Sequence, residues 1–476
     1  MGYNKMNNSI SVRNPRTGQV DYSFDPPTEQ EISSLCQSGR SAQKAWAKNG
    51  IDYRIDVMQS WKKAYVENQD QLIKTLAIDT GRIHETKLEV EAIPKSIDRW
   101  CEIAKELFTN PISKPSSIPF ISMEQHSIPY SLVGIISPWN VPNLLAHIDA
   151  IPALLAGSSV IIKPSEFTPR FIEPLQNIVE AVPELSDVLQ YVQGAGETGA
   201  KLVNEVDLIC FTGSVSTGTK VGEQAAKNFI PAFLELGGKD AAIVLETADL
   251  DKATFAILWG SLVNAGQSCL SIERVYVMES VYESFISQLT EKAKNLNLAY
   301  PEMDSGEIGP IISPNQATLI ENHLHDAKSK GAVVHCGGEL EHHGGGDWIF
   351  PTVLSNVNHG MKIMTEETFG PVIPVMSVSS SDEAIRYAND TEFGLSGAVF
   401  GEESVAKSVA EKMEAGAISI NDAGLTSILF DGEKNSFKSS GLGGSRMGPG
   451  SIQRFLRKKV FYTKMNSEND PWWFKV

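Results

Sequence analysis

Residues 133–136 read Val-Gly-Ile-Ile and are followed at once by Ser-Pro-Trp-Asn-Val-Pro at 137–142. A short apolar run rich in β-branched residues, ended by a proline-containing turn, predicts a buried strand. Similar runs lie at 160–162, 189–192 and 208–211, with helical patterns between them at 171–182 and 217–228. Short apolar strands that alternate with helices predict a parallel sheet covered by helices on both faces.

A second series of apolar runs indicates a further sheet in the later half of the chain. These runs lie at 241–245, 274–278, 332–335, 372–375 and 417–421. A chain of 476 residues is also too long for one ordinary hydrophobic core. We therefore predict an α/β fold with two α/β domains, the second of which begins near Leu236.

The composition is that of a folded globular protein with an acidic surface. Hydrophobic residues make up 42% of the chain, charged residues 21%, and the formal net charge is −17. This charge repels nucleic acid and anionic membranes, so neither is an expected partner. The sequence contains no recognisable secretory leader and no apolar run long enough for a membrane span. Its five cysteines are odd in number and lack metal-like spacing, so we expect a cytoplasmic protein without a metal site.

A cysteine and a glutamate stand in unusual surroundings. Cys269 follows Gly-Gln-Ser, so its thiol has small polar neighbours, although a free cysteine is more often a small buried apolar residue. Glu235 lies between two leucines and precedes Gly237 and Gly238, which permit close approach of the backbone to a ligand. A partly desolvated glutamate suits a general base for water, although the same pattern fits an ordinary strand end.

The turn after the first strand carries an amide between two prolines. Pro138 and Pro142 restrict the backbone around Asn140. The Asn140 amide can donate to a developing oxyanion, an effect worth about 10²–10³ in rate. The alternative interpretation is a simple rigid turn.

Two further segments follow predicted strands, at 163–166 and 211–218. Nucleotides bind at the carboxyl ends of parallel strands, where Glu166 can accept both hydroxyls of a ribose and would repel a 2′-phosphate. Gly213 and Ser214 precede a helix whose first N–H groups can hold pyrophosphate. The turn at 194–199 is a weaker glycine signal.

Glu367 and Phe369 form a last candidate pair. They stand two residues apart and so share one side of an extended chain. Together the two side chains can bind a ribose. The alternative interpretation of this segment is a solvated acidic turn.

Together these segments resemble the aldehyde dehydrogenase superfamily from about Ser9 to Phe461. The family patterns Pro-Trp-Asn-x-Pro, Glu-x-Gly-Gly-Lys, Gly-Gln-x-Cys and Glu-x-Phe-Gly-Pro match residues 138–142, 235–239, 266–269 and 367–371. The resemblance implies a Rossmann-like cofactor domain, a catalytic domain and a small β oligomerisation arm. We assign these to residues 1–109 with 131–235, to 236–450, and to 110–130 with 451–476, respectively.

The resemblance also implies a role for each matching residue. Cys269 is the nucleophile that forms a thioester, Asn140 and the Cys269 backbone N–H hold the oxyanion, and Glu235 activates the water that hydrolyses the thioester. NAD is the expected cofactor, with NADP as an alternative, and a homodimer or homotetramer is the expected assembly. The residues expected to contact the cofactor are Ser137, Pro138, Trp139, Lys163, Ser165, Glu166, Gly196, Gly213, Ser214, Thr217, Leu236, Glu367 and Phe369.

Two segments depart from the commonest family pattern. Leu-Ser-Ile-Glu-Arg at 270–274 stands where many members have small residues before the arginine, and 440–446 is offset from the usual late Ser-Gly-x-Gly-Arg run. We expect neither segment to touch the catalytic residues.

The substrate is expected to be an apolar or aromatic aldehyde. The loop 423–430 contains Leu425, Ile428, Leu429 and Phe430, and no Lys or Arg lies between Ile420 and Asp431 to bind a substrate carboxylate. One alternative function is a coenzyme A-acylating dehydrogenase, against which Glu235 argues because acylating relatives typically lack a base there. The other is a non-enzymatic binding or structural protein on the same fold, which need not retain all three catalytic residues.

Overall fold

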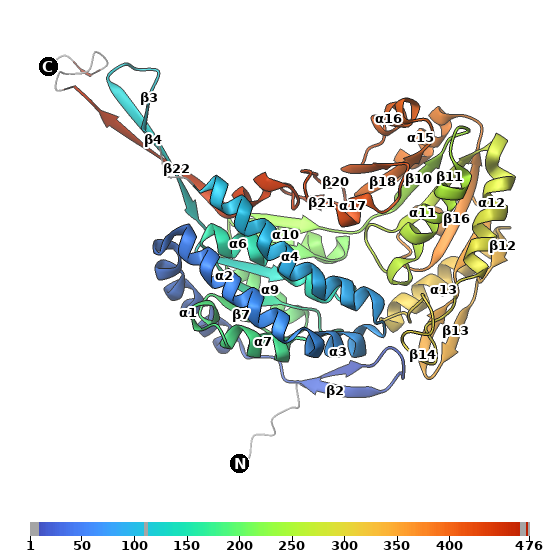
Figure 1. Ribbon diagram of the computed structural model, residues 1–476, viewed down its shortest axis with the longest axis horizontal. Coiled ribbons are helices and arrows are strands. Elements are labelled where there is room, and N and C mark those ends of the chain that lie inside the picture. Colours follow the sequence, from blue (N-terminus) through green and yellow to red (C-terminus); the bar gives the residue numbers. More distant parts are fainter. Residues whose placement is uncertain (1–8, 109–112, 467–472, 475–476) are drawn as a thin grey trace.

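The computed structural model describes residues 9–108, 113–466 and 473–474. The start of the chain, on which the leader prediction rests, and residues 110–112, 467–472 and 475–476 of the predicted arm lie outside the described residues. None of the helices in the described ranges is long and apolar enough to cross a lipid bilayer. The division into domains stays a prediction, but two separate large sheets are present (Figure 1).

The earlier apolar runs form a six-stranded sheet. Its order is β21 (Gly441–Leu442), β9 (Ala232–Glu235), β8 (Leu208–Thr212), β5 (Leu132–Ile136), β6 (Ser159–Lys163), β7 (Leu189–Tyr191). The strands from β9 to β7 run parallel, and β21 adds an antiparallel edge beside β9. Parallel strands end at a common edge of the sheet, so the residues after β5, β6, β8 and β9 come close together.

Helices cover both faces of this sheet, as predicted. Leu132 and Ile136 of β5 belong to the core formed with α1 (Glu29–Lys48), α9 (Gly196–Glu205) and α10 (Val215–Lys227). Val133 and Ile135, whose side chains alternate with these along the strand, belong to the opposite core. That core includes α2 (Gly50–Glu67), α3 (Gln69–Thr80), α4 (His84–Leu107), α6 (Ala150–Ala156), α7 (Ile172–Glu180) and α8 (Pro183–Ser186).

The later apolar runs form a seven-stranded sheet around a second core. Its order is β12 (Val333–Cys336), β15 (Thr352–Ser355), β16 (Val372–Val378), β11 (Ile272–Met278), β10 (Asp240–Val244), β18 (Ser396–Phe400), β19 (Ala417–Ile420). The helices packed around it include α11 (Leu250–Leu262), α12 (Glu279–Lys294), α13 (Pro314–Ser329), α15 (Ser381–Asn389) and α16 (Glu403–Ala410).

One strand of this second sheet departs from the parallel pattern. The edge strand β12 pairs antiparallel with β15. The chain between them forms the hairpin of β13 (Leu340–His343) and β14 (Gly346–Ile349) instead of a crossover helix. Only parallel neighbours require a long crossover, so this connection allows the antiparallel direction.

A third, smaller sheet projects from the body of the molecule (Figure 1). It consists of β3 (Ser113–Pro115), β4 (Ile121–Pro129) and β22 (Leu456–Lys464), all paired antiparallel. The residues just before β22 are packed into the body of the molecule. Ile452 and Phe455 are buried there in the helical core beside the six-stranded sheet. A separate hairpin of β1 (Ile10–Arg13) and β2 (Val20–Phe24) lies near the N-terminal end.

Candidate functional site

A cavity of about 130 Å³ lies between the strand ends of the two large sheets. Residues after β5 and β8 line it together with residues that precede β10, β11 and β16. The predicted site residues in its wall are Pro138, Trp139, Asn140, Gly213, Ser214, Leu236, Cys269, Glu367 and Phe369. The chain thus brings together patterns that are up to 231 residues apart (369 − 138).

Cys269 is half-buried in this wall, three residues before β11. Burial, followed by the charges of Glu367 and Asp240, raises the pKa of the Cys269 thiol to about 12. The turn before it is fixed by Gln267, whose amide donates to the carbonyl oxygens of Asn264 and Pro310. The backbone that carries Cys269 is therefore held in place, and the raised pKa makes the thiol a neutral group at neutral pH.

Asn140 lies beside the same turn. Its Nδ2 donates a 3.0 Å hydrogen bond to the backbone oxygen of Gln267, two residues before Cys269. The Asn140 backbone oxygen accepts from Nη2 of Arg82 at 2.8 Å and from Nδ2 of Asn264 at 3.0 Å. One N–H of the Asn140 amide is thus used to hold it beside the thiol, and an amide has a second to offer.

Glu235 ends strand β9 and is half-buried. Its Oε2 accepts a 2.9 Å hydrogen bond from the hydroxyl of Ser436, and its backbone pairs with Gly441 of β21. The expectation that segment 440–446 does not touch the catalytic residues is therefore wrong. The segment reaches Glu235 because it adds an edge strand to β9, a pairing that local sequence does not encode.

The two glycines after Leu236 allow close packing around the cavity. A Cβ at Gly237 would lie 2.7 Å from the Glu367 carboxylate, and a Cβ at Gly238 would lie 2.4 Å from the backbone oxygen of Cys269. The Gly238 N–H instead donates to Oε1 of Glu367 at 2.9 Å. Any larger residue would push the Glu367 and Cys269 segments apart.

Phe369 and Trp139 face each other across the cavity wall. Their ring centroids are 5.5 Å apart in an edge-to-face arrangement. Burial, followed by the charge of Glu273, raises the pKa of the neighbouring Glu367 to about 8. The wall therefore combines two aromatic rings with a carboxyl that is mostly protonated at neutral pH.

The predicted residues at the end of β6 form a neighbouring cluster. The buried Lys163 Nζ donates to the backbone oxygens of Pro164 and Gly194 and lies 3.5 Å from Oε2 of Glu166. Burial lowers the pKa of Lys163. The Ser165 hydroxyl accepts from the N–H of Phe167, closing the turn that carries Glu166.

Thr217, Gly196 and Ser137 lie around the cavity rather than in its wall, and Ser214 joins the wall to one of them. Ser214 is the N-cap of α10 and accepts from the N–H of Thr217. Gly196 begins α9, and a side chain there would meet open space. Ser137 follows β5, and its buried hydroxyl has no hydrogen-bond partner within the described chain.

Four residues of the cavity wall escaped the sequence prediction: Leu145, Thr212, Gly237 and Gln316. Gly237 lies inside a quoted pattern, and Thr212 ends an apolar strand, so both carried a usable signal. Leu145 lies on α5 (Pro142–His147) and Gln316 on α13, where the helical pattern does not show which position faces a cavity.

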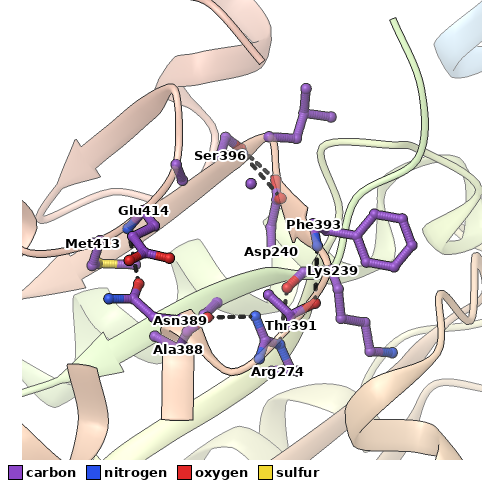
Figure 2. Close-up of a pocket in the computed structure, with 14 residues that line it drawn as sticks. Lys239, Asp240, Arg274, Ala388, Asn389, Thr391, Phe393, Ser396, Met413 and Glu414 are labelled. Carbon is purple, nitrogen blue, oxygen red and sulfur yellow. Dashed lines mark hydrogen bonds between the residues drawn. The ribbon is translucent and has the colours of Figure 1, made fainter. Parts of the chain in front are cut away.

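A second, much smaller pocket lies beside Asp240, Arg274 and Ser396 (Figure 2). Its volume is about 10 Å³, which is close to the space that one water molecule needs. Asp240 accepts from both the N–H and the hydroxyl of Ser396, and Arg274 donates to the backbone oxygens of Lys239 and Ala388. These polar groups bond one another, so we regard this pocket as a packing feature.

Comparison with known proteins identifies the family. Residues 3–461 match the model of the aldehyde dehydrogenase family. The chain belongs to the aldehyde dehydrogenase family. It is therefore an NAD(P)-dependent oxidoreductase with the α/β fold of that family, as the sequence patterns predict.

Solved aldehyde dehydrogenases superpose on nearly the whole chain. A protein of Anabaena variabilis assigned as aldehyde dehydrogenase PutA is 56% identical, with a TM-score of 0.97 and coverage of 98% of this chain and 100% of that one. Betaine aldehyde dehydrogenase of Staphylococcus aureus, solved in complex with NAD⁺, is 29% identical, with a TM-score of 0.91 and coverage of 98% and 94%.

Curated aldehyde dehydrogenase relatives differ in the aldehyde that their names give. 4,4'-Diapolycopene aldehyde oxidase of Methylomonas sp is 33% identical and covers 90% of this chain and 82% of its own. A protein of Mycolicibacterium smegmatis assigned as succinate-semialdehyde dehydrogenase (NADP(+)) is 32% identical, with coverage of 96% and 89%. At such identities family membership fixes the class of reaction and leaves the substrate open.

Proposed function

We propose that this chain oxidises an aldehyde to its carboxylic acid through a thioester on Cys269, with NAD as the cofactor. The observation that carries the proposal is the shared cavity wall of Cys269, Asn140 and Glu367, which brings a thiol, an amide and a carboxyl around one space. Each of these comes from a different part of the chain.

The chain's own groups divide the reaction into two stages. The Cys269 thiol first releases its proton to water, and the resulting thiolate adds to the carbonyl carbon. The second N–H of the Asn140 amide and the Cys269 backbone N–H hold the oxygen as it gains charge. NAD, held by the residues around the cavity, would supply the acceptor for the hydride of this carbon. Glu235 then takes a proton from water, whose oxygen attacks the thioester and releases the acid and the Cys269 thiol.

The residues around the cavity fit a dinucleotide. Glu166 and Lys163, with Ser165 shaping their turn, would hold the adenosine ribose. The pyrophosphate would lie near Gly196, Gly213, Ser214 and Thr217, at the starts of α9 and α10. The part of the dinucleotide between the strand ends would be lined by Ser137, Pro138, Trp139 and Leu236. The Ser137 hydroxyl, which has no hydrogen-bond partner among the described residues, can bond a ligand. Glu367 and Phe369 would grip the second ribose.

We propose an apolar or aromatic aldehyde as the substrate. Leu145 lines the cavity with Cys269, and the loop residues Ile428 and Leu429 are largely exposed. Arg99 and Lys434 approach this loop, but they donate to the backbone oxygens of Phe430 and Thr426, respectively. The cations near the loop are thus engaged by protein groups.

We further propose that the projecting sheet of β3, β4 and β22 joins copies of the chain into a homodimer or homotetramer. The outer edge of β22 has no strand beside it among the described residues, and such edges favour pairing with another chain. Light scattering of the purified protein tests this, and a monomer at micromolar concentration would contradict it.

The decisive experiment measures NADH formation with a panel of aldehydes, with and without coenzyme A, for the wild type and for Cys269→Ala. We expect activity that requires Cys269, needs no coenzyme A and is highest with alkanals or benzaldehydes. A requirement for coenzyme A would favour the acylating reaction instead. Faster turnover of succinate semialdehyde than of every apolar aldehyde would refute the substrate proposal alone.

A further inference from the structure

The Glu367–Phe369 segment is held by a buried carboxylate that has no role in the mechanism above. We propose that Glu273 is a positioning residue, which fixes Glu367 and Phe369 in the geometry that grips the ribose and thereby sets the affinity for NAD. This inference rests on the proposed role of that pair. Glu273 also lies in one of the two segments that depart from the commonest family pattern.

Glu273 uses both carboxylate oxygens on this segment. Its Oε2 accepts from the N–H of Thr368 at 2.8 Å and from Nζ of Lys239 at 2.7 Å. Its Oε1 accepts from the N–H of Phe369 at 2.7 Å. Glu273 and Lys239 are both buried, so this charged pair has little competition from water.

Thr368, between the two gripping residues, is the anchor of the segment. Besides its N–H bond to Glu273, its hydroxyl accepts from Nζ of Lys239 at 3.1 Å, and its backbone oxygen accepts from Nε2 of Gln316 at 2.7 Å. Thr368 is buried, while Glu367 and Phe369 on either side reach the cavity. Because the backbone of Thr368 is fixed, the side chains of Glu367 and Phe369 on either side are held toward the cavity.

The backbone of Phe369 needs this support. Its φ is 50°, in the left-handed region that an aromatic residue rarely adopts. Such a conformation persists only where the surroundings impose it. The bond to Glu273 acts directly on the Phe369 backbone, whereas the edge-to-face contact with Trp139 acts on its side chain.

The charge of Glu273 also acts on Glu367, second to burial among the causes that raise its pKa. A mostly protonated Glu367 can donate to a ribose hydroxyl as well as accept from one. Glu273 thus influences both the position of the Glu367 carboxyl and its hydrogen-bonding character.

Glu273→Gln tests the proposal, because an amide has one acceptor oxygen and cannot serve all three donors. By calorimetry, we expect the Kd for NAD to rise at least about tenfold, whereas iodoacetamide should alkylate Cys269 in the absence of NAD at a rate within about twofold of the wild type. The matched control is Glu403→Gln, an exposed glutamate paired with Lys407, which should change neither quantity. Equal NAD affinity of Glu273→Gln and the wild type would overturn the inference.

A double-mutant cycle separates positioning from general stability. In the background of Glu367→Gln with Phe369→Ala, Glu273→Gln should weaken NAD binding by less than about twofold, because the residues through which it acts are gone. Full additivity would mean a merely structural role. Failure of the wild type to bind NAD would count against the proposed function instead.

Glu273→Gln leaves Lys239 as a buried charge without a charged partner, which destabilises the fold. A further variant therefore serves as a control for this loss of stability. Lys239→Gln combined with Glu273→Gln removes both charges. We expect the same loss of NAD affinity, and a combined variant that binds NAD as the wild type does would overturn the inference.

Discussion

The hydroxyl of Ser436 donates a 2.9 Å hydrogen bond to Oε2 of Glu235, which is 201 residues earlier in the chain. Ser436 directly precedes β20 (Phe437–Lys438), and Glu235 is the last residue of β9. The two segments meet because β21 pairs along β9. The proposed general base is thus oriented by a side chain from the late segment of the chain.

Ser436→Ala is expected to slow thioester hydrolysis without slowing thioester formation. A hydrogen bond to a charged group contributes about 1.5–3 kcal/mol, of which water restores a part, so we expect the steady-state rate to fall about tenfold. Stopped-flow measurement should show the initial burst of NADH at its wild-type rate. Glu235→Gln should give the same burst with a still slower second phase. A burst that slows together with the steady state would mean that Ser436 acts on Cys269 or on the cofactor.

The thiol of Cys269 should react slowly in the absence of cofactor. Thiolate is the reactive form, and a pKa of about 12 leaves little of it at neutral pH. The rate of alkylation by iodoacetamide, followed by mass spectrometry of the Cys269 peptide, should rise about tenfold per pH unit from pH 7 to pH 10. A plateau below about pH 9 would contradict this.

Glu367 offers a second test of the same thiol. After burial, the Glu367 charge is the largest cause of the raised pKa of Cys269. Glu367→Gln should therefore accelerate alkylation at pH 9, where Glu367 is mostly ionised, while it weakens NAD binding. The matched control is Glu366→Gln, the neighbouring exposed glutamate, and equal acceleration by both variants would exclude a specific effect of Glu367.

The sequence predicts the central strands well and several others poorly. In β5, β6 and β8 every residue is buried, so each strand contains a run of at least three consecutive apolar or glycine residues that stands out from the helices around it. Strand β18, by contrast, begins with Ser396 and Gly397, which are typical of a turn. Strand β9 ends in the polar Glu235, so the sequence indicates it only through the alternative interpretation of Glu235 as a strand end. Strand β15 is flanked by Pro351 and Asn356 and is not among the predicted strands.

In the candidate site, too, the sequence predicts some features and misses others. Cys269, Asn140 and Glu367 lie in patterns a few residues long, and each pattern is recognisable by itself. Their supporting contacts, such as Glu273 with Phe369 and Ser436 with Glu235, join segments far apart in the chain. Such contacts follow from which strands become neighbours, and local sequence does not contain that information.

Arg82→Met should destabilise the fold. The buried Arg82 lies 3.6 Å from Oε1 of Glu89 and holds the Asn140 backbone, and loss of one partner of a buried charge pair costs about 3–5 kcal/mol. Denaturant unfolding should show a lower midpoint. As a control, Arg386→Met removes an exposed arginine and should leave the midpoint nearly unchanged.

The defect of Arg82→Met should depend on pH. Burial raises the pKa of Glu89 from its ordinary value of about 4.5 to about 7, and the charge of Arg82 opposes this rise. The folded chain therefore binds the Glu89 proton more tightly than the unfolded chain, and ionising Glu89 costs stability as the pH rises from about 4.5 through 7. Without Arg82 this cost grows, so the difference between variant and wild type should be smaller at pH 5 than at pH 8. A difference independent of pH would mean that the lost contact with Asn140 dominates.

Glu166→Gln should shift the cofactor preference toward NADP. The Glu166 carboxylate lies 3.5 Å from Nζ of Lys163, at the end of β6, where the adenosine ribose is expected. A 2′-phosphate placed there would be repelled by Glu166 and attracted by Lys163, and like charges brought together cost several kcal/mol. Removing the carboxylate should raise the ratio of kcat/KM for NADP to that for NAD by at least about tenfold, measured with one aldehyde. Glu173→Gln, an exposed glutamate in the first turn of α7, is the matched control and should leave the ratio unchanged. An unchanged ratio in Glu166→Gln would place the 2′-hydroxyl away from Glu166 and would require another residue to select the cofactor.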